Sequence, residues 1–188
     1  MSLLVSQTGS VNDLTIVTSQ IFYTAGAMNQ LHRRSVCAPV TNGAELDEHL
    51  LFLEPLIGTN WTGGYVGEDP PDLQIVLHCE SILGGKAVKY SREAAAVDFA
   101  NETHFYWSPD RDKVLFLSLN NRGIVGKGVV ELQGESIVLR GESHGSDGSV
   151  EFKTIMSVDA TGQLKDTFSR KKNGEWVQGH YQEFELVE

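Results

Sequence analysis

The sequence predicts an all-β protein: a single antiparallel up-and-down β-barrel of about ten strands, with a short helix at one end. From residue 60 onward the chain consists of short runs rich in β-branched and aromatic residues, separated by clusters of turn-forming residues. The same stretch has no convincing helical period, which argues against β-α-β units because parallel strands need long crossover connections. Closure of the sheet would remove the exposed edges of an open ten-stranded sheet.

The number of strands follows from the number of turn-forming clusters. Nine clusters follow residue 60, and nine turns join ten strands. The clearest is Asn173-Gly174, because both central positions of a type I′ hairpin turn need a positive φ angle. The clusters lie at 67–71, 83–86, 95–101, 108–112, 120–123, 133–135, 144–148, 159–162 and 171–174.

Alternation of apolar and polar residues predicts which side chains share a face of each strand. In the run 150–158, Phe152 lies on the apolar side with every second residue. In the last run the same alternation places Trp176 and His180 on one side. The period of two is typical of antiparallel strands with one buried face.

A short helix and an N-terminal extension precede the barrel. Over 44–56, leucines at helical spacing form an apolar face, and acidic residues occupy the first turn, where the helix dipole favours them. Asn42 is the expected N-cap, and Pro55 and Gly58 end the helix. We expect this helix to close one mouth of the barrel. Residues 1–43 form an extension, either one strand plus a loop or a partly disordered tail.

The charge and composition argue against several classes of partner. The net charge is −10 and basic residues form no stripe, so we expect no nucleic-acid partner and no membrane partner. The N-terminus lacks the basic region and the uninterrupted apolar core of a signal peptide, which predicts a cytoplasmic protein. Cys37 and Cys79 form no C-x-x-C pair, so we expect two free thiols and no metal or redox motif.

The run Leu53-Glu54-Pro55-Leu56-Ile57-Gly58-Thr59-Asn60-Trp61-Thr62-Gly63 resembles the opening of lipocalin-like (calycin) barrels, in which a short helix leads into a Gly-x-Trp strand. Within that group it is similar to a bacterial lipocalin-like family of unknown function, and the resemblance covers residues 44–188. One extra residue, Asn60, separates Thr59 from Trp61, so that the strand contains a bulge or Trp61 points elsewhere. The lipocalin disulfides and the Arg on the last strand are absent, which implies an intracellular relative.

Nitrobindin-like haem barrels are a more distant resemblance, based on chain size and on His180 near the C-terminal strand. This resemblance implies that His180 would ligate the haem iron, and would be a metal ligand only if haem binds. The alternative is a core histidine satisfied by a neighbour such as Asp166 or Gln182. We therefore expect no cofactor, with haem as the alternative.

Two charged residues share faces with aromatic side chains in the predicted strands. Arg92 lies on the same face as Tyr90, and Asp166 on the same face as Phe168. An interior Arg can bind a carboxylate ligand through two parallel hydrogen bonds. The alternative is that these charges lie near strand ends and point into water.

No nucleophile, metal or phosphate-binding motif occurs in the chain, so we expect a binding protein rather than an enzyme and assign no catalytic residue. The predicted partner is a small hydrophobic or amphipathic molecule inside the barrel. One alternative is a haem-binding protein or haem-dependent enzyme that uses His180. Another is a ligand-free barrel that binds a partner protein, for example as a homodimer. The candidate ligand-binding residues are Trp61, Tyr90, Arg92, Tyr106, Phe116, Phe152, Met156, Asp166, Phe168, Trp176 and His180.

Overall fold

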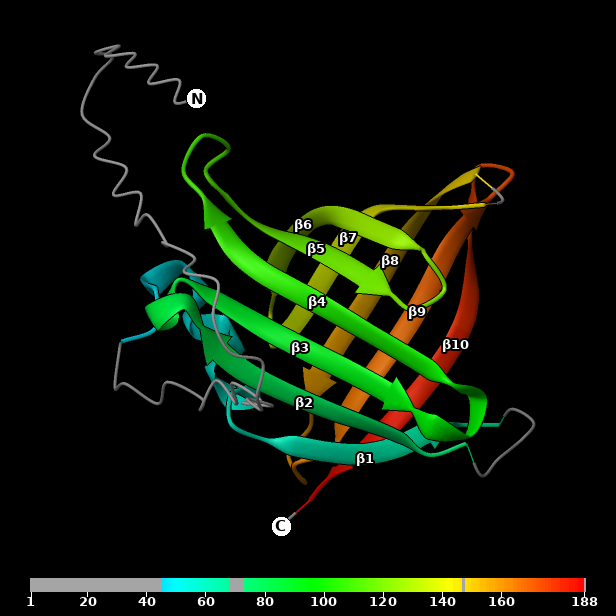
Figure 1. Cartoon of the computed structure of the whole chain (residues 1–188), viewed down its shortest axis with the longest axis horizontal. Coiled ribbons are helices and arrows are strands. Elements are labelled where there is room, and N and C mark those ends of the chain that lie inside the picture. Colours follow the sequence, from blue (N-terminus) through cyan, green and yellow to red (C-terminus); the bar gives the residue numbers. More distant parts are fainter. Residues whose placement is uncertain (1–44, 68–72, 147, 188) are drawn as a thin grey trace, which may run out of the picture. The chain divides into compact units, whose positions relative to one another are not determined.

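The computed structural model describes residues 45–67, 73–146 and 148–187, which form a closed antiparallel barrel of ten strands (Figure 1). Consecutive strands are neighbours around the barrel, and β1 pairs with β10 to close it. The predicted all-β fold and its up-and-down order are therefore confirmed. The strands are β1 (Asn60–Tyr65), β2 (Ile75–Ile82), β3 (Ala87–Ala94), β4 (Phe99–Ser108), β5 (Lys113–Asn120), β6 (Val125–Gln133), β7 (Ser136–Gly145), β8 (Gly148–Val158), β9 (Leu164–Lys172) and β10 (Glu175–Leu186).

The turns lie close to the predicted clusters. In the β9–β10 turn, Asn173 and Gly174 have φ angles of 53° and 86°, as a type I′ turn requires. The predicted turn at 95–101 is too long, because β4 already begins at Phe99. Most of the cluster at 67–71 lies outside the described residues, as do the extension 1–43, Asn42 and Cys37.

The helix before the barrel is a 3-10 helix, η1 (Glu48–Leu56). Its buried leucines, Leu50, Leu53 and Leu56, are spaced three residues apart, and a 3-10 helix places residues i and i+3 on one face. The prediction of Asn42 as N-cap is wrong, because the helix begins only at Glu48 and Asp47 is its N-cap; the Asp47 side chain accepts a hydrogen bond from the His49 backbone N–H. Two further short 3-10 helices, η2 (Leu83–Gly85) and η3 (Ala95–Val97), lie in the β2–β3 and β3–β4 turns.

Helix η1 covers the end of the barrel that carries the β2–β3 turn. The backbone N–H of Asp47 donates to the carbonyl of Gly85 in that turn, and Nζ of Lys86 lies 3.1 Å from Oδ2 of Asp47. The leucines of η1 belong to the same hydrophobic core as the inward side chains of the strands. This packing supports the expectation that the helix closes one mouth of the barrel. Within the described residues, no helix has the length and apolar character needed to cross a membrane.

Close contact between β6 and β7 depends on glycine. A Cβ atom added to Gly128 would lie 2.0 Å from the carbonyl oxygen of Arg140, and one added to Gly141 would lie 2.2 Å from that of Lys127. Gly126 lies two residues before Gly128 on the same face of β6. A Cβ atom added there would lie at ordinary contact distances, 3.4 Å from Cβ of Ser118 and 3.5 Å from the ring of Phe152. The two strands can therefore approach this closely only because Gly128 and Gly141 lack side chains.

Strand β10 contains a bulge that interrupts its alternation. Gln178 pairs with Ser169 and His180 pairs with Phe168, so Gly179 is an extra residue. Because one extra residue reverses the alternation, Trp176 does not share the face of His180. The prediction that these two side chains lie on one side of the strand is wrong for this reason.

Candidate functional site

The barrel interior contains a cavity of about 320 Å³, partly open to solvent, between the core beside η1 and the opposite end of the barrel. Its lining extends to Asn120 and Ile124 at the β5–β6 turn, which lies at the end away from η1. The side chains around it come from eight strands, β3 to β10. The lining residues are Tyr90, Arg92, Phe99, Asn101, Thr103, Phe105, Phe116, Ser118, Asn120, Ile124, Gly126, Leu139, Ser143, Phe152, Thr154, Met156, Asp166, Phe168 and His180.

One side of the cavity is a continuous series of ring contacts, which we call the aromatic wall: Phe116, Phe152, Phe168 and His180. The ring centroids of Phe116 and Phe152 lie 5.7 Å apart, and those of Phe152 and Phe168 lie 5.9 Å apart. The His180 ring stacks on Phe168 at 4.9 Å, with 12° between the ring planes. The ring of Tyr65 also contacts His180 in a T-shaped arrangement, with 5.4 Å between the ring centroids. These contacts fix the rings as a preformed apolar surface.

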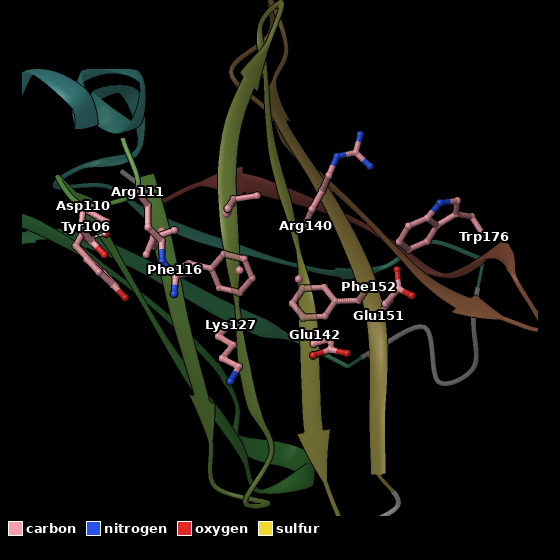
Figure 2. A pocket seen from close by; sticks show the side chains of 15 residues that line it. Tyr106, Asp110, Arg111, Phe116, Lys127, Arg140, Glu142, Glu151, Phe152 and Trp176 are labelled. Carbon is pink, nitrogen blue, oxygen red and sulfur yellow. Dashed lines mark hydrogen bonds between the residues drawn. The ribbon is translucent and has the colours of Figure 1, made fainter. Parts of the chain in front are cut away.

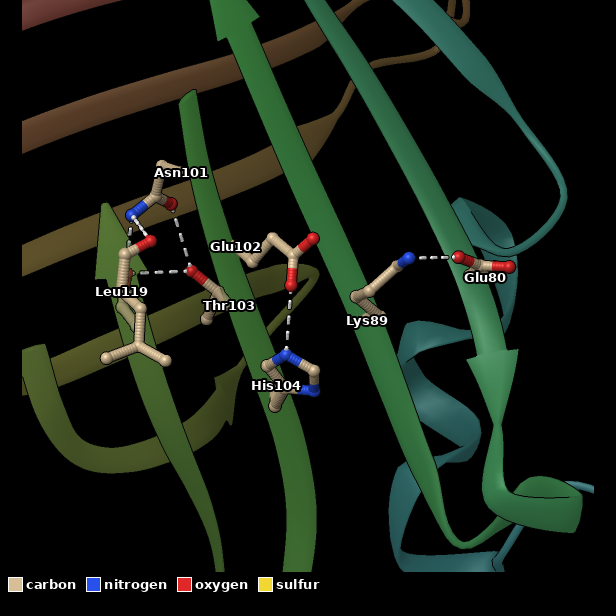
Figure 3. A network of polar contacts seen from close by, with 8 residues as sticks. Glu80, Lys89, Asn101, Glu102, Thr103, His104 and Leu119 are labelled. Atoms are coloured by element: carbon tan, nitrogen blue, oxygen red, sulfur yellow. Dashed lines mark hydrogen bonds and ion pairs between the residues drawn. The ribbon is translucent and has the colours of Figure 1, made fainter. Parts of the chain in front are cut away.

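A second side of the cavity is polar and consists of Asn101, Thr103 and Ser118, which we call the polar wall. Oγ of Ser118 accepts hydrogen bonds from Nδ2 of Asn101 at 2.9 Å and from Oγ1 of Thr103 at 3.0 Å. Figure 3 shows that Asn101 and Thr103 project to the side of β4 opposite Glu102 and His104. The alternation of β4 thus directs two hydrogen-bonding side chains inward.

A buried ion pair crosses the barrel from β3 to β9. Arg92 donates a hydrogen bond from Nη2 to Oδ2 of Asp166, and the hydroxyl of Tyr90 lies 3.4 Å from the same nitrogen. The Asp166 side chain is only 1% exposed, whereas that of Arg92 is 16% exposed. Both side chains line the cavity. The guanidinium and the carboxylate therefore neutralise each other at the cavity surface.

Two buried side chains, Asp166 of this pair and Gln182 beside it, keep polar atoms without a hydrogen-bond partner. Among the described residues, Oδ1 of Asp166 has no partner, and neither Nε2 nor Oε1 of Gln182 has one. Gln182 is fully buried and pairs with Asp166 across β10 and β9. Unpartnered polar atoms inside a protein cost free energy, so groups of this kind usually bind water or a ligand.

The protein interior shifts the proton affinities of two groups at this site. Burial raises the pKa of the Tyr90 hydroxyl to about 12, so this side chain is neutral at physiological pH. Burial opposes the charge of Arg92, but the Coulombic effects of Tyr90 and Asp166, together with their hydrogen bonds, raise the pKa of the guanidinium above its usual value. Arg92 therefore stays charged inside the barrel.

The structure brings most of the predicted ligand-binding residues to this one cavity. Trp61, Tyr106 and Trp176 do not line it. The eight that do are Tyr90, Arg92, Phe116, Phe152, Met156, Asp166, Phe168 and His180.

Trp61 is buried in the core and binds to the end of η1 through Thr59. Its indole Nε1 donates to Oγ1 of Thr59 at 2.7 Å, and this hydroxyl donates to the carbonyl of Leu56. The extra residue Asn60 hydrogen-bonds to His78 at 2.8 Å. The insertion therefore does not turn Trp61 out of the core, where it is 3% exposed.

Tyr106 and Trp176 lie on the outside of the barrel. Tyr106 follows the buried Phe105 and so points outward by alternation. The bulge at Gly179 reverses the alternation of β10, so Trp176 points outward while His180 points inward. Both line an open groove of about 940 Å³, shown in Figure 2, whose charged side chains include Arg140 and Glu142. We take the inner cavity as the candidate site because it combines an apolar wall with buried, unpartnered polar atoms.

The residues of the polar wall and Gln182 are not among the predicted ligand-binding residues. Asn101 was assigned to a turn, although it shares a face with Thr103 and Phe105 by simple alternation. The pairing of Arg92 with Asp166 had no local signal, because 74 residues separate them in the chain. Arg170, two residues beyond Phe168 on β9, is exposed and does not line the cavity.

A haem group would depend on His180 alone. The imidazole lines the cavity, and a histidine would be a suitable ligand if haem binds. One face of its ring is stacked on Phe168. Among the described residues, no three His, Cys, Asp or Glu side chains gather as a metal site.

Comparison with known proteins does not assign this chain to a family. No family model matches the sequence, and no curated protein matches it. A solved structure, described as the crystal structure of Rv2717c from M. tuberculosis, is similar with a TM-score of 0.47 and 17% sequence identity. That match covers 76% of this chain and 98% of the other. The predicted lipocalin-like (calycin) family is not confirmed by these matches.

Proposed function

We propose that this barrel binds a small, mostly apolar molecule in its interior cavity. The observation that supports this function is the cavity of about 320 Å³ with an aromatic wall on one side and buried polar groups on the other. Ligand sites in proteins are typically apolar concave surfaces of roughly 300–1,000 Å³ with a few well-placed polar groups. The cavity matches that description in both size and lining.

The expected binding energy comes mainly from burial of apolar surface. A ligand that buries roughly 200 Å² of apolar surface gains about 5 kcal/mol at ~25 cal/mol per Å², before the cost of immobilising it. The aromatic wall reduces that cost, because its rings are already packed against one another in the free protein. Polar groups at the cavity surface would then select among ligands of similar size.

The test is whether a molecule copurifies with the protein and depends on the cavity. We expect native mass spectrometry of the full chain to detect a recurrent bound small molecule. Thr154 lines the cavity on β8, so Thr154→Phe should fill space and remove that molecule. Thr167 does not line the cavity, and Thr167→Phe on the neighbouring strand β9 is the matched control. Equal retention by both variants would contradict binding in the cavity.

Haem binding is the second candidate, favoured only by the position of His180 in the cavity lining. If haem binds, it would supply redox and gas-binding chemistry, and this chain would hold it through His180 and the aromatic wall. Haem added to the purified protein should give a shifted Soret band that disappears in His180→Ala. No shift in the unaltered protein, or a shift that His180→Ala keeps, would exclude this candidate.

A further inference from the structure

The charge balance of the cavity restricts which ligands it can bind. Arg92 and Asp166 are already paired, so the guanidinium is not free to neutralise an incoming carboxylate. A carboxylate ligand would instead bring a second negative charge near Asp166 in a poorly solvated space. A cationic ligand would leave an excess positive charge beside Arg92. An uncharged ligand keeps the existing pair intact and avoids both costs.

The unpartnered oxygen of Asp166 defines the group that the ligand should carry. An ionised carboxylate only accepts hydrogen bonds, and Oδ1 of Asp166 has no donor among the described residues. The residue is 1% exposed and lines the cavity, so bulk water does not compensate this atom freely. A hydroxyl or N–H group on the ligand would supply the missing donor, and a hydrogen bond to a charged acceptor is stronger than one between neutral groups.

The polar wall defines a second group. Oγ of Ser118 accepts from Nδ2 of Asn101, and Oγ1 of Thr103 lies within hydrogen-bond distance of both Oγ of Ser118 and Oδ1 of Asn101. Ser118 lines the same cavity as Asp166. A second polar group on the ligand would therefore meet hydrogen-bonding side chains at the polar wall.

The aromatic wall defines the shape of the ligand body. Phe116, Phe152, Phe168 and His180 present rings in mutual contact, and such a surface packs best against a flat ring system through offset or edge-to-face contacts. We infer that the cavity selects an uncharged aromatic molecule whose hydroxyl or N–H group donates to Asp166, and that it discriminates against carboxylates. This inference rests on the proposed ligand-binding function.

Three molecules with one ring system test the inference: 2-naphthol, 2-naphthoate and naphthalene. We expect calorimetric titration of the unaltered full chain at pH 7 to show that 2-naphthol binds at least tenfold more tightly than 2-naphthoate. Naphthalene lacks the donor and should bind at least threefold more weakly than 2-naphthol. Because the unaltered chain is used, this comparison does not depend on the folding of any variant.

A double variant, Arg92→Gln with Asp166→Asn, removes both charges together and leaves no unpaired ion. It should reduce the preference for 2-naphthol over 2-naphthoate to less than threefold. A preference for 2-naphthoate in the unaltered chain, or an unchanged preference in a folded double variant, would overturn the inference while leaving the binding function intact. If none of the three molecules binds and native mass spectrometry detects no copurified small molecule, the binding function itself fails.

Discussion

The ion pair between Arg92 and Asp166 dominates the chemistry of the barrel interior at the scale of single residues. Two charges buried together are tolerated only while they remain paired, because an isolated ion pays a large desolvation cost. The Asp166 carboxylate is almost completely buried, so its negative charge is stabilised by the Arg92 guanidinium more than by solvent. This dependence makes the pair sensitive to removal of one partner.

We predict that Arg92→Met lowers the free energy of unfolding by about 3–5 kcal/mol, because the Asp166 charge loses its partner. The double variant Arg92→Met with Asp166→Leu should recover most of this loss, since it leaves no buried charge. Urea denaturation measures both effects. If the single variant is no less stable than the double variant, the pair is not the buried, mutually dependent unit described above.

Cys79, a buried residue of β2 that does not itself line the cavity, provides a second prediction. Burial raises the pKa of its thiol to about 12, and the side chain is 1% exposed. Because the thiolate is the reactive form, Cys79 should be inert to thiol reagents in the folded protein at pH 8. A Cys37→Ser chain isolates this thiol. Labelling should begin only in denaturant, and rapid labelling of the folded chain would show that Cys79 is accessible.

Individual residues differ in how far the sequence could predict them. Tyr90 and Arg92 were placed on one face because strand alternation determines side-chain direction without tertiary information. The partner of Arg92 could not be predicted, because contact between β3 and β9 depends on closure of the whole barrel. Cys79 was correctly expected to be a free thiol.

At the scale of elements, close packing of β6 against β7 requires glycine at position 128 but not at position 126. We predict that Gly128→Ala lowers the free energy of unfolding by roughly 1–3 kcal/mol, because its Cβ would meet backbone atoms of β7. Gly126→Ala is the matched control on the same strand and face, and it should cost much less. Chemical denaturation compares the two variants, and equal losses would show that the close approach is not the cause.

The cap of η1 predicts a dependence of stability on pH. Hydrogen bonds from His49, Lys86 and the His49 backbone lower the pKa of Asp47 from 3.8 to about 2. Because the folded pKa lies below the unfolded value, Asp47 stabilises the fold above about pH 4, and this contribution disappears as the pH falls to about 2. Asp47→Asn should therefore lower Tm at pH 7.

The same cap variant should unfold at nearly the same temperature as the unaltered protein at pH 2, where Asp47 is increasingly protonated. Glu54→Gln, on the same helix, is the control for loss of a carboxylate outside this cap. Thermal unfolding followed by circular dichroism at both pH values measures the difference. A Tm difference that is as large at pH 2 as at pH 7 would contradict the ionic role of the cap.

Element boundaries were easier to predict than irregularities within elements. Turn residues and alternation located the hairpins because both signals are local. The bulge at Gly179 was missed, and that omission placed Trp176 on the wrong face. A glycine inside a strand can mark a bulge, but sequence alone does not show whether the partner strand requires one.

At the scale of the whole molecule, the barrel has a filled end and a hollow end. The leucines of η1 and the buried side chains around Trp61 fill the end next to the helix. The cavity occupies the space beyond them, bounded by the aromatic and polar walls. The fold class followed from the sequence because it depends on local patterns. The hollow interior did not, because it depends on how ten strands together place large and small side chains.

The most direct test of binding inside the barrel is calorimetric titration of 2-naphthol into the unaltered chain, Thr154→Phe and Thr167→Phe. Thr154 lines the cavity and Thr167 does not, so the two variants add the same ring inside or outside the site. We predict binding to the unaltered chain and to Thr167→Phe, with at least tenfold weaker binding to Thr154→Phe. Equal affinity for all three proteins, or no binding to any of them, would contradict a ligand site inside the barrel.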